Sequence, residues 1–466
     1  MRSRLSALSL FAMLMLSLIL AACGGTPAAA PTAAPAAEAP TAAPAAEAPT
    51  AAPAAEAPTA APAEAPTAAE AATAAPAADA TTITYFTFSA APDHLKDLDA
   101  MIAAFKAENP GIDVKVETAP YADYFTKLQT LVAGGTAPDV FELNYENFVS
   151  YASKGVLADM TSMAAADAGF ADKFYPKAYQ AFSRDGKQYG LPQSFSDVVL
   201  FYNKDLFDAA GVGYPTAEWT WKEELDAAQK LTSADKGVWG DYAPIQFFEF
   251  YKTAAQSGCG VFGADGKSVT INEKGCVDSL TWMVDKINKY KVTPTDADMA
   301  GVSDGDLFKQ GKIAMLRTGI WMFSAFKDAP FKWDIALEPG NTQKAHAFFA
   351  NSVAISASSK NQEAAWKWAQ FFTGSDAAAK IRVAASWELP ALNNKALFDE
   401  YLKQTPPETR QVVFDALASA VTPPVTDKQS ELQDTIGKLL DQAKAGSITP
   451  QEALDQAKTQ IEALIK

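Results

Sequence analysis

The chain contains very little histidine and cysteine. Its 466 residues include 2 histidines and 3 cysteines, and these are the side chains that most often bind zinc in proteins. The two imidazoles, His94 and His346, stand near no nucleophile motif. The sequence therefore gives no sign of a metal centre or of imidazole catalysis.

Positive charge is also scarce. Lys and Arg total 39 against 55 Asp and Glu, which gives a formal net charge of −16 at pH 7. A nucleic-acid partner needs a basic face for its phosphates, and anionic lipid attracts basic segments, so the charge argues against both. Hydrophobic residues at 48% and charged residues at 20% are the proportions of a globular protein. The length suggests two or three domains, or two large lobes.

A long apolar run stands at the N-terminus. Residues 5–20 are apolar apart from serines, and Arg2 and Arg4 precede them. The run is shorter than the ~20 residues that span a bilayer. A charged start, a short apolar core and small residues at the end predict a secretory signal peptide over residues 1–22.

Cys23 directly follows Leu20-Ala-Ala, which resembles the lipobox of bacterial lipoproteins. The resemblance implies cleavage before Cys23 and attachment of diacylglycerol to its sulfur. We therefore expect an extracytoplasmic protein, anchored to the outer face of the cell membrane by lipidated Cys23. The alternative is an ordinary secretory signal in which the cysteine falls by chance.

Residues 23–81 are of low complexity. The sequence Pro-Thr-Ala-Ala-Pro-Ala-Ala-Glu-Ala begins at Pro31 and repeats at Pro40 and Pro49. This region has almost no large apolar side chain, so it cannot build a core. Its prolines favour extended polyproline II backbone. The composition predicts a disordered tether between the anchor and a folded body.

Regular periodicity begins near residue 82. Residues 82–88 alternate and are rich in β-branched and aromatic side chains, as in a strand. Apolar residues then recur at helical spacing from Leu95 to Phe105, after Asp93 as the expected cap. The same reading predicts a strand at 112–116, a helix at 121–132 and a strand at 140–143. This alternation predicts parallel pairing with right-handed crossovers.

The carboxyl ends of such strands are the usual place for a ligand in an open α/β sheet. Here the strands end at Phe88 and Ser89, at residues 118–121 and at residues 144–147. No turn carries G-x-G-x-x-G or a Walker lysine. We therefore expect a ligand other than a nucleotide, and no cofactor.

Several phrases of the folded body stand in the order of a known family. They include VVLFYNKDLF at 198–207, FKQGKIAM at 308–315, TGIW at 318–321, GTAPDV at 135–140 and WELP at 387–390. Together they resemble the extracellular solute-binding proteins of ABC importers, in the carbohydrate-binding branch that includes maltose-binding protein. The resemblance spans about residues 82–466.

This resemblance implies a two-lobe α/β fold of the periplasmic-binding-protein type, with a hinge of crossing segments and a ligand cleft between the lobes. Lobe one would comprise residues 82–192 plus 350–386, and lobe two residues 193–349 plus 387–466. Ligand that contacts both lobes favours the closed state through its differential affinity.

The implied function is capture of a sugar or oligosaccharide and its delivery to the membrane subunits of an ABC importer. We expect a monomer that is not an enzyme. The main alternative keeps the fold and changes the ligand to a phosphate ester, polyamine, peptide or iron. Arg317 is the candidate for a phosphate ester, because phosphate prefers Arg or Lys. A glycoside-cleaving enzyme, with Glu142 paired to Glu146 or Asp197, is the remaining alternative.

Two cysteines lie in the folded body. Cys259 and Cys276 flank the turn signal Gly263-Ala-Asp-Gly266. Outside the cytoplasm such a pair predicts a disulfide. The alternative is two free, buried thiols.

Aromatic rings cover the C–H faces of sugars, and carboxylates or amides bind the hydroxyls. By resemblance, the chain crosses between the lobes near residues 192–197, 349–353 and 386–389. The aromatic candidates are Trp321, which the family places at the cleft, Trp387 on the third crossing and Phe88 at the end of the first strand. The polar candidates at strand ends and on the first crossing are Ser89, Asn144, Glu146, Asn147, Gln193, Ser196 and Asp197. The Glu-Asn order at 146–147 departs from the acidic-then-basic pair of maltose-binding protein, which leaves the type of oligosaccharide open.

Overall fold

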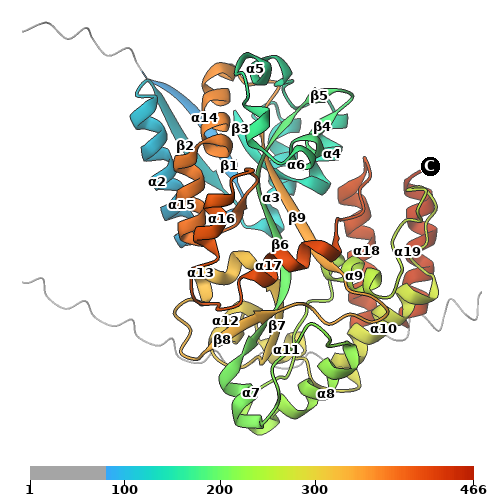
Figure 1. Cartoon of the computed structure of the whole chain (residues 1–466). Helices are drawn as coiled ribbons and strands as arrows, with labels where there is room; N and C mark the ends of the chain where they lie inside the picture. The colour runs from blue at the N-terminus through green and yellow to red at the C-terminus, as the bar shows by residue number, and fades with distance from the viewer. Residues whose placement is uncertain (1–79) are drawn as a thin grey trace, which may run out of the picture. The chain divides into compact units, whose positions relative to one another are not determined.

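The computed structural model describes residues 80–466. The predicted signal peptide, the lipidation of Cys23 and nearly all of the predicted tether lie outside these residues. The described part is built on a mixed sheet with the strand order β10-β6-β9-β3-β1-β2, and β7 and β8 extend it by pairing with β6 (Figure 1). The strands of this sheet are β1 (Thr81–Thr87), β2 (Ile112–Thr118), β3 (Val140–Asn144), β6 (Gly190–Asn203), β7 (Met315–Gly319), β8 (Trp333–Ala336), β9 (His346–Ile355), β10 (Leu389–Pro390) and β11 (Ala420–Val421).

The longer helices surround this sheet. They are α2 (Pro92–Glu108), α3 (Tyr121–Ala133), α4 (Tyr145–Ser153), α8 (Trp221–Leu231), α9 (Phe247–Gln256), α10 (Lys274–Asn288), α14 (Gln362–Gly374), α15 (Asp376–Ala385), α18 (Gln429–Lys444) and α19 (Pro450–Leu464). Shorter helices are α5 (Thr161–Ala166), α6 (Pro176–Ala181), α7 (Lys204–Ala210), α11 (Asp296–Met299), α12 (Asp304–Lys309), α13 (Phe323–Phe326), α16 (Lys395–Tyr401) and α17 (Gln411–Ala416). Single 3-10 turns are η1 (Ala171–Lys173), η2 (Ala234–Lys236), η3 (Ile320–Met322) and η4 (Leu417–Ser419), and β4 (Ser183–Arg184) pairs with β5 (Lys187–Gln188).

The strand–helix alternation predicted for residues 82–143 is confirmed. β1 pairs in parallel with β2, with Thr81 opposite Ile112, and with β3, with Tyr85 opposite Val140. The expected cap of α2 is wrong. Ala91 is the N-cap and makes no capping bond, since its methyl side chain has no acceptor, and Pro92 suits the first helical position.

Two separate cores cover the two faces of this part of the sheet. Ile83 and Tyr85 of β1 pack with Phe105 of α2 and Trp368 of α14, whereas Phe86 packs on the other face with Tyr124 of α3. The alternation of buried side chains along β1 therefore produces a helix–sheet–helix sandwich, since successive side chains of a strand point to opposite faces.

β6 is long because it takes part in two sets of pairings. Its first half pairs with β9 and β10, and its second half, from Val198 to Asn203, pairs with β7 and β8. β9 pairs with β3 and, at His346 and Ala347, with β11. Both strands therefore run through the middle of the molecule and join its two halves (Figure 1).

The second half contains a helical core of its own. Apolar side chains of α9, α10, α18 and α19 pack together there, including Phe250, Leu280 and Ile436.

The disulfide predicted between the two cysteines of the folded body is confirmed, and it lies in this core. Cys259 and Cys276 are bonded, with their Cα atoms 5.4 Å apart.

The segment after the third crossing packs against elements expected in lobe one. The backbone amide of Tyr175 donates to the carbonyl of Ala391, and α16 lies against α15. The assignment of residues 387–466 to lobe two stays a prediction.

No helix within residues 80–466 is both long and apolar enough to cross a bilayer.

Candidate functional site

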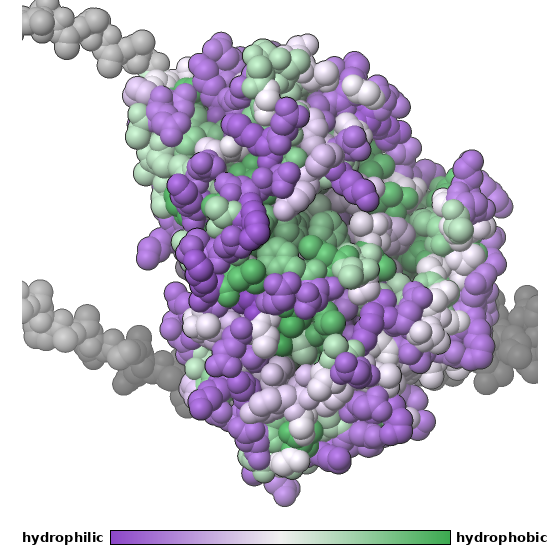
Figure 2. All heavy atoms as spheres, viewed as in Figure 1, coloured by the Kyte–Doolittle hydropathy of each residue, from purple (hydrophilic) through white to green (hydrophobic). Residues whose placement is uncertain are grey.

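A cavity of about 550 Å³ lies where the two halves of the sheet meet. Its volume falls in the range of small-molecule sites, roughly 300–1,000 Å³. The lining comes from the ends of β1 and β3, the first turns of α2, α3 and α9, the middles of β6 and β9, and the segments around η3 and Trp387. Figure 2 shows apolar side chains gathered in a hollow across the middle of one face.

Six of the ten predicted ligand-binding residues line this cavity. They are Phe88, Ser89, Asn144, Ser196, Trp321 and Trp387. The other four are buried nearby without lining it, namely Glu146, Asn147, Gln193 and Asp197.

Aromatic side chains from both halves contribute to the walls. Phe88 and Tyr121 come from the ends of β1 and the start of α3, and Phe248, Trp321 and Phe349 come from α9, η3 and β9. Tyr121 and Phe248 already touch, with ring centroids 6.1 Å apart. Trp321 packs beside Phe349 at 5.9 Å. The cavity thus offers ring surfaces from several directions.

Trp387 is held differently from Trp321. Its side chain is only 3% exposed, it stacks on His94 at a centroid distance of 4.6 Å, and the Arg382 guanidinium lies 4.3 Å from its ring centre. Little of the indole face is therefore left for a ligand. Trp321 is partly exposed and keeps a surface toward the cavity.

Asn144 has its hydrogen-bonding capacity filled by protein groups. Its Nδ2 donates to Tyr121 Oη at 2.9 Å and to Glu146 Oε1 at 2.6 Å, while its Oδ1 accepts from the backbone amide and from Nδ2 of Asn147. The amide also caps α4. Glu146 and Asn147 therefore lie behind Asn144 and hold it in place. Burial raises the pKa of Glu146 to about 7.

Gln193 and Ser196 bond to other buried groups. Gln193 donates to Glu142 Oε1 at 3.0 Å, and burial, with a contribution from Glu388, raises the pKa of Glu142 to about 7. Ser196 is 3.5 Å from Glu388 Oε1. Asp197 is buried in β6, and neither carboxylate oxygen has a hydrogen-bond partner among residues 80–466. Burial raises the pKa of Asp197 well above its usual value.

Arg317 carries the one permanent positive charge among the lining residues within 80–466. Its Nη2 pairs with Glu224, its Nη1 lies 3.1 Å from Asp241, and its Nε lies 3.1 Å from Glu338. Burial opposes the charge, but these carboxylates raise the pKa of Arg317 well above its usual value. All three nitrogens are thus engaged within the protein.

The remaining charged lining groups are mostly acidic. They are Asp93, Glu249, Asp304 and Glu388, with His94 beside them. Glu249 Oε1 accepts from Lys252 at 2.5 Å, and its Oε2 has no partner among residues 80–466. Burial lowers the pKa of His94, so the imidazole is neutral at pH 7. The cavity therefore presents acceptors rather than cations.

Sequence reasoning missed several lining residues. They are Asp93, His94, Tyr121, Gln246, Phe248, Glu249, Asp304, Ser324, Phe349, Asn351 and Glu388. Tyr121 stands at a predicted strand end and also opens the helix predicted at 121–132, so nothing in the sequence separates it from the buried residues of that helix. In the structure Tyr124 is buried and Tyr121 is 41% exposed. The others depend on long-range packing that no local pattern marks.

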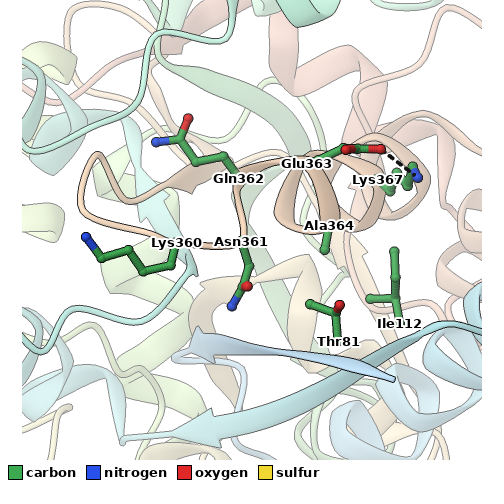
Figure 3. A pocket seen from close by; sticks show the side chains of 8 residues that line it. All are labelled: Thr81, Ile112, Lys360, Asn361, Gln362, Glu363, Ala364 and Lys367. Carbon is green, nitrogen blue, oxygen red and sulfur yellow. Dashed lines mark ion pairs between the residues drawn. The ribbon is translucent and has the colours of Figure 1, made fainter. Parts of the chain in front are cut away.

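A second, shallower hollow lies at the far edge of the sheet. It is lined by Thr81, Ile112 and residues 360–364, with Lys367 paired to Glu363 (Figure 3). Its side chains are mostly exposed and polar. Within residues 80–466, no three His, Cys, Asp or Glu side chains are grouped as metal ligands. The larger cavity is therefore the candidate site.

Comparisons with known proteins point to one family. Residues 91–379 match the model described as bacterial extracellular solute-binding protein. The galactooligosaccharide-binding protein of Bacillus subtilis is 27% identical over 373 residues, which are 76% of this chain and 83% of that protein.

Solved structures share the fold. An ABC substrate-binding protein from Listeria monocytogenes, in complex with cycloalternan, is 49% identical with a TM-score of 0.81, and the match covers 83% of this chain and 99% of that one. The maltose/maltodextrin-binding domain from Bdellovibrio bacteriovorus, bound to maltotriose, is 21% identical with a TM-score of 0.72 over 83% of this chain and all of that one. These likenesses confirm the predicted two-lobe α/β fold.

Proposed function

Because the chain belongs to the family of bacterial extracellular solute-binding proteins, we propose that it captures an oligosaccharide in the cavity and delivers it to an ABC importer. The observation that carries this proposal is the lining, which combines partly exposed aromatic rings with carboxylate and amide oxygens. Rings cover the C–H faces of a sugar, and oxygens accept from its hydroxyls.

A neutral ligand fits this lining better than an anionic one. A phosphate ester needs a free guanidinium or ammonium, whereas Arg317 is fully engaged by Glu224, Asp241 and Glu338. The acidic lining groups would repel a phosphate. We therefore rank the phosphate ester below the oligosaccharide.

The relatives support the sugar class. Proteins that match this chain are named for binding galactooligosaccharide, arabinooligosaccharide and maltooligosaccharide, and the Listeria protein is in complex with cycloalternan. Cycloalternan is the first ligand to test, because that protein is 49% identical to this chain.

Binding would be coupled to lobe closure. Phe88 and Tyr121 line the cavity from elements predicted in lobe one, and Phe248 and Trp321 from elements predicted in lobe two. A ligand that touches both sets stabilises the arrangement in which they approach. The membrane subunits of the importer would recognise that closed form.

The test is a thermal-shift screen of the purified protein against cycloalternan, maltotriose, a galactooligosaccharide and glucose 6-phosphate. Ligand at a hundredfold excess over Kd adds about 2.7 kcal/mol to the free energy of unfolding. We expect stabilisation by at least one oligosaccharide and none by glucose 6-phosphate. Stabilisation by the phosphate ester alone contradicts the proposal.

We also propose that the protein binds sugar without cleaving it. Glu142, Glu146 and Asp197, the residues considered for a glycosidase pair, are buried and do not line the cavity. Chromatography of the oligosaccharide after long incubation should recover it intact. Cleavage that disappears in Glu142→Gln supports the enzyme instead.

The cellular location of the protein is also a proposal, because it depends on Cys23, which lies outside residues 80–466. The family is extracellular by description, and a Streptococcus pneumoniae protein that matches the chain is named a solute-binding lipoprotein. We propose that lipidated Cys23 anchors the protein to the membrane. A fatty-acid label that is incorporated by the wild type and lost in Cys23→Ala supports this anchor.

A further inference from the structure

Tyr121 is an exposed aromatic side chain inside the candidate site. It is 41% exposed, although it opens a helix whose next aromatic residue, Tyr124, is fully buried. Ligand pockets are lined mainly by apolar and aromatic side chains, and Tyr121 is one of the residues that line this cavity. The ring of Tyr121 therefore presents surface to whatever occupies the cavity.

Neighbouring rings hold Tyr121 in one orientation. Phe88 lies 5.3 Å away and Phe125 5.6 Å away, both nearly perpendicular to it, and Phe248 approaches from α9 at 6.1 Å. Perpendicular contacts of this kind are a favoured geometry between aromatic rings. The ring is thus fixed before a ligand arrives, which lowers the entropy cost of binding.

The hydroxyl of Tyr121 is fixed by Asn144. Asn144 Nδ2 donates to Tyr121 Oη at 2.9 Å, so the oxygen acts as an acceptor toward the protein. Among residues 80–466, the Tyr121 hydroxyl accepts from Asn144 and donates no hydrogen bond of its own. That proton is available to an oxygen of the ligand.

The orientation of the Asn144 amide is itself determined by its surroundings. Glu146 Oε1 accepts from Nδ2, and Asn147 donates twice to Oδ1. A flipped amide would place its oxygen against the Glu146 carboxyl and its NH₂ group against the Asn147 donors. Glu146 and Asn147 therefore direct the NH₂ group of Asn144 toward Tyr121.

We propose that Tyr121 is a specificity-determining residue of the oligosaccharide site, and that Asn144 is its positioning residue, oriented by Glu146. This inference rests on the proposed function. The Tyr121 ring stacks on the C–H face of one sugar ring, and its hydroxyl donates to an oxygen of the same sugar or its neighbour. The ligand class is a neutral oligosaccharide with an accessible apolar ring face.

The test compares variants by calorimetric titration with cycloalternan or, if cycloalternan does not bind, with the oligosaccharide that stabilises the wild type in the thermal-shift screen. Tyr121→Ala should weaken binding at least tenfold, and Tyr121→Phe, which keeps the ring, by about three- to tenfold. Asn144→Ser keeps an oxygen that can cap α4 and removes the donor to Tyr121. It should weaken binding several-fold in the wild type and produce no further loss in a Tyr121→Phe background.

Tyr214→Ala is the matched control, because Tyr214 is exposed but does not line the cavity. This variant should bind the oligosaccharide with the affinity of the wild type. Thermal melts without ligand check that each variant is folded. If the wild type binds none of the oligosaccharides of the thermal-shift screen, the proposed function fails as well. If the wild type binds and folded Tyr121→Ala binds equally well, this inference alone is wrong. If Asn144→Ser still weakens binding in the Tyr121→Phe background, Asn144 acts on the ligand itself and its positioning role is wrong.

Discussion

The indole ring of Trp321 lies over the backbone of Gly319, in the space that a side chain at position 319 would occupy. A Cβ at this position would overlap the six-membered part of the indole. The backbone of Gly319 is extended, with φ −87° and ψ 162°, so any residue can adopt it. The glycine is required for the ring it accommodates and not for its own conformation.

Gly319→Ala should therefore displace Trp321 without straining the backbone. We expect the affinity for the oligosaccharide to fall about tenfold, or about 1.4 kcal/mol, as measured by calorimetric titration. Gly437→Ala is the matched control, because nothing lies within 4 Å of a Cβ at that position, and it should bind like the wild type. If folded Gly319→Ala bound the oligosaccharide as tightly as the wild type, the position of the Trp321 ring would not matter for binding.

Trp321→Ala should remove a ring that the ligand covers. Burying such a side chain is worth about 1.5–3 kcal/mol, so the affinity should fall roughly ten- to a hundredfold. The melting temperature without ligand should change little, because the ring is only partly buried in the free protein. Trp219→Ala, at a partly exposed tryptophan outside the cavity, serves as control. Unfolding of ligand-free Trp321→Ala would instead identify the ring as part of the core.

Local pattern predicted the regular elements well. The alternation of residues 82–88 and the helical spacing after Leu95 depend on nearest neighbours, and β1 and α2 form where they predict. The disulfide between Cys259 and Cys276 could also be predicted, because only two cysteines remain in the folded body.

The interior of the site was harder to predict. Trp387 was expected to meet a ligand and does line the cavity, yet His94 and Arg382 pack on its ring. Arg382 stands in α15, which ends just before Trp387, but His94 comes from α2, far away in the sequence. Tyr121 shares the helical spacing of a core residue, and only the packing of Tyr124 beneath the sheet end shows that Tyr121 is displaced into the cavity. Such outcomes are decided by tertiary contacts, which periodicity does not contain.

Glu146→Gln should change how stability depends on pH. Burial raises the pKa of Glu146 to about 7, above the 4.5 of an exposed glutamate, so the folded protein binds this proton more tightly than the unfolded chain. The resulting stabilisation is present below pH 4.5 and is lost as the pH rises through 7. Relative to the wild type, the variant should therefore gain about 2–3 kcal/mol of unfolding free energy between pH 5 and pH 8, since one pKa unit is about 1.4 kcal/mol.

Urea titrations of the ligand-free protein at pH 5, 6, 7 and 8 measure this difference. Glu363→Gln, at an exposed glutamate on α14, controls for the loss of one negative charge. A difference that stays constant across this range contradicts the raised pKa of Glu146.

Removing the disulfide should lower stability without changing the site. Cys259 and Cys276 are 17 residues apart, and closing a loop of that length contributes about 3 kcal/mol in the chain-entropy model. The double variant Cys259→Ala/Cys276→Ala should lose about that amount in urea unfolding and keep the wild-type affinity, because neither residue lines the cavity. Wild-type protein unfolded in the presence of reductant should show a similar loss. If the folded double variant bound the oligosaccharide more weakly than the wild type, the prediction that the disulfide does not affect the binding site would be wrong.

A hydrogen bond crosses the cavity between Asp93 at the start of α2 and Ser324 of α13. Ser324 Oγ donates to Asp93 Oδ2 at 2.6 Å, and both residues line the cavity. The two helices belong to segments predicted in different lobes, so this bond stabilises the arrangement that encloses a ligand. Net contributions of about 0.5–1.5 kcal/mol are typical of one hydrogen bond.

Ser324→Ala should therefore weaken oligosaccharide binding about two- to tenfold by favouring the separated arrangement. Small-angle scattering of the ligand-free variant should give a larger radius of gyration than that of the wild type. A double-mutant cycle with Asp93→Ala distinguishes this bond from direct contact with the sugar. If Ser324 acts only through Asp93, Ser324→Ala has no further effect in the Asp93→Ala background. An undiminished effect there would mean that Ser324 contacts the ligand itself and that the bond between the helices has no part in closure.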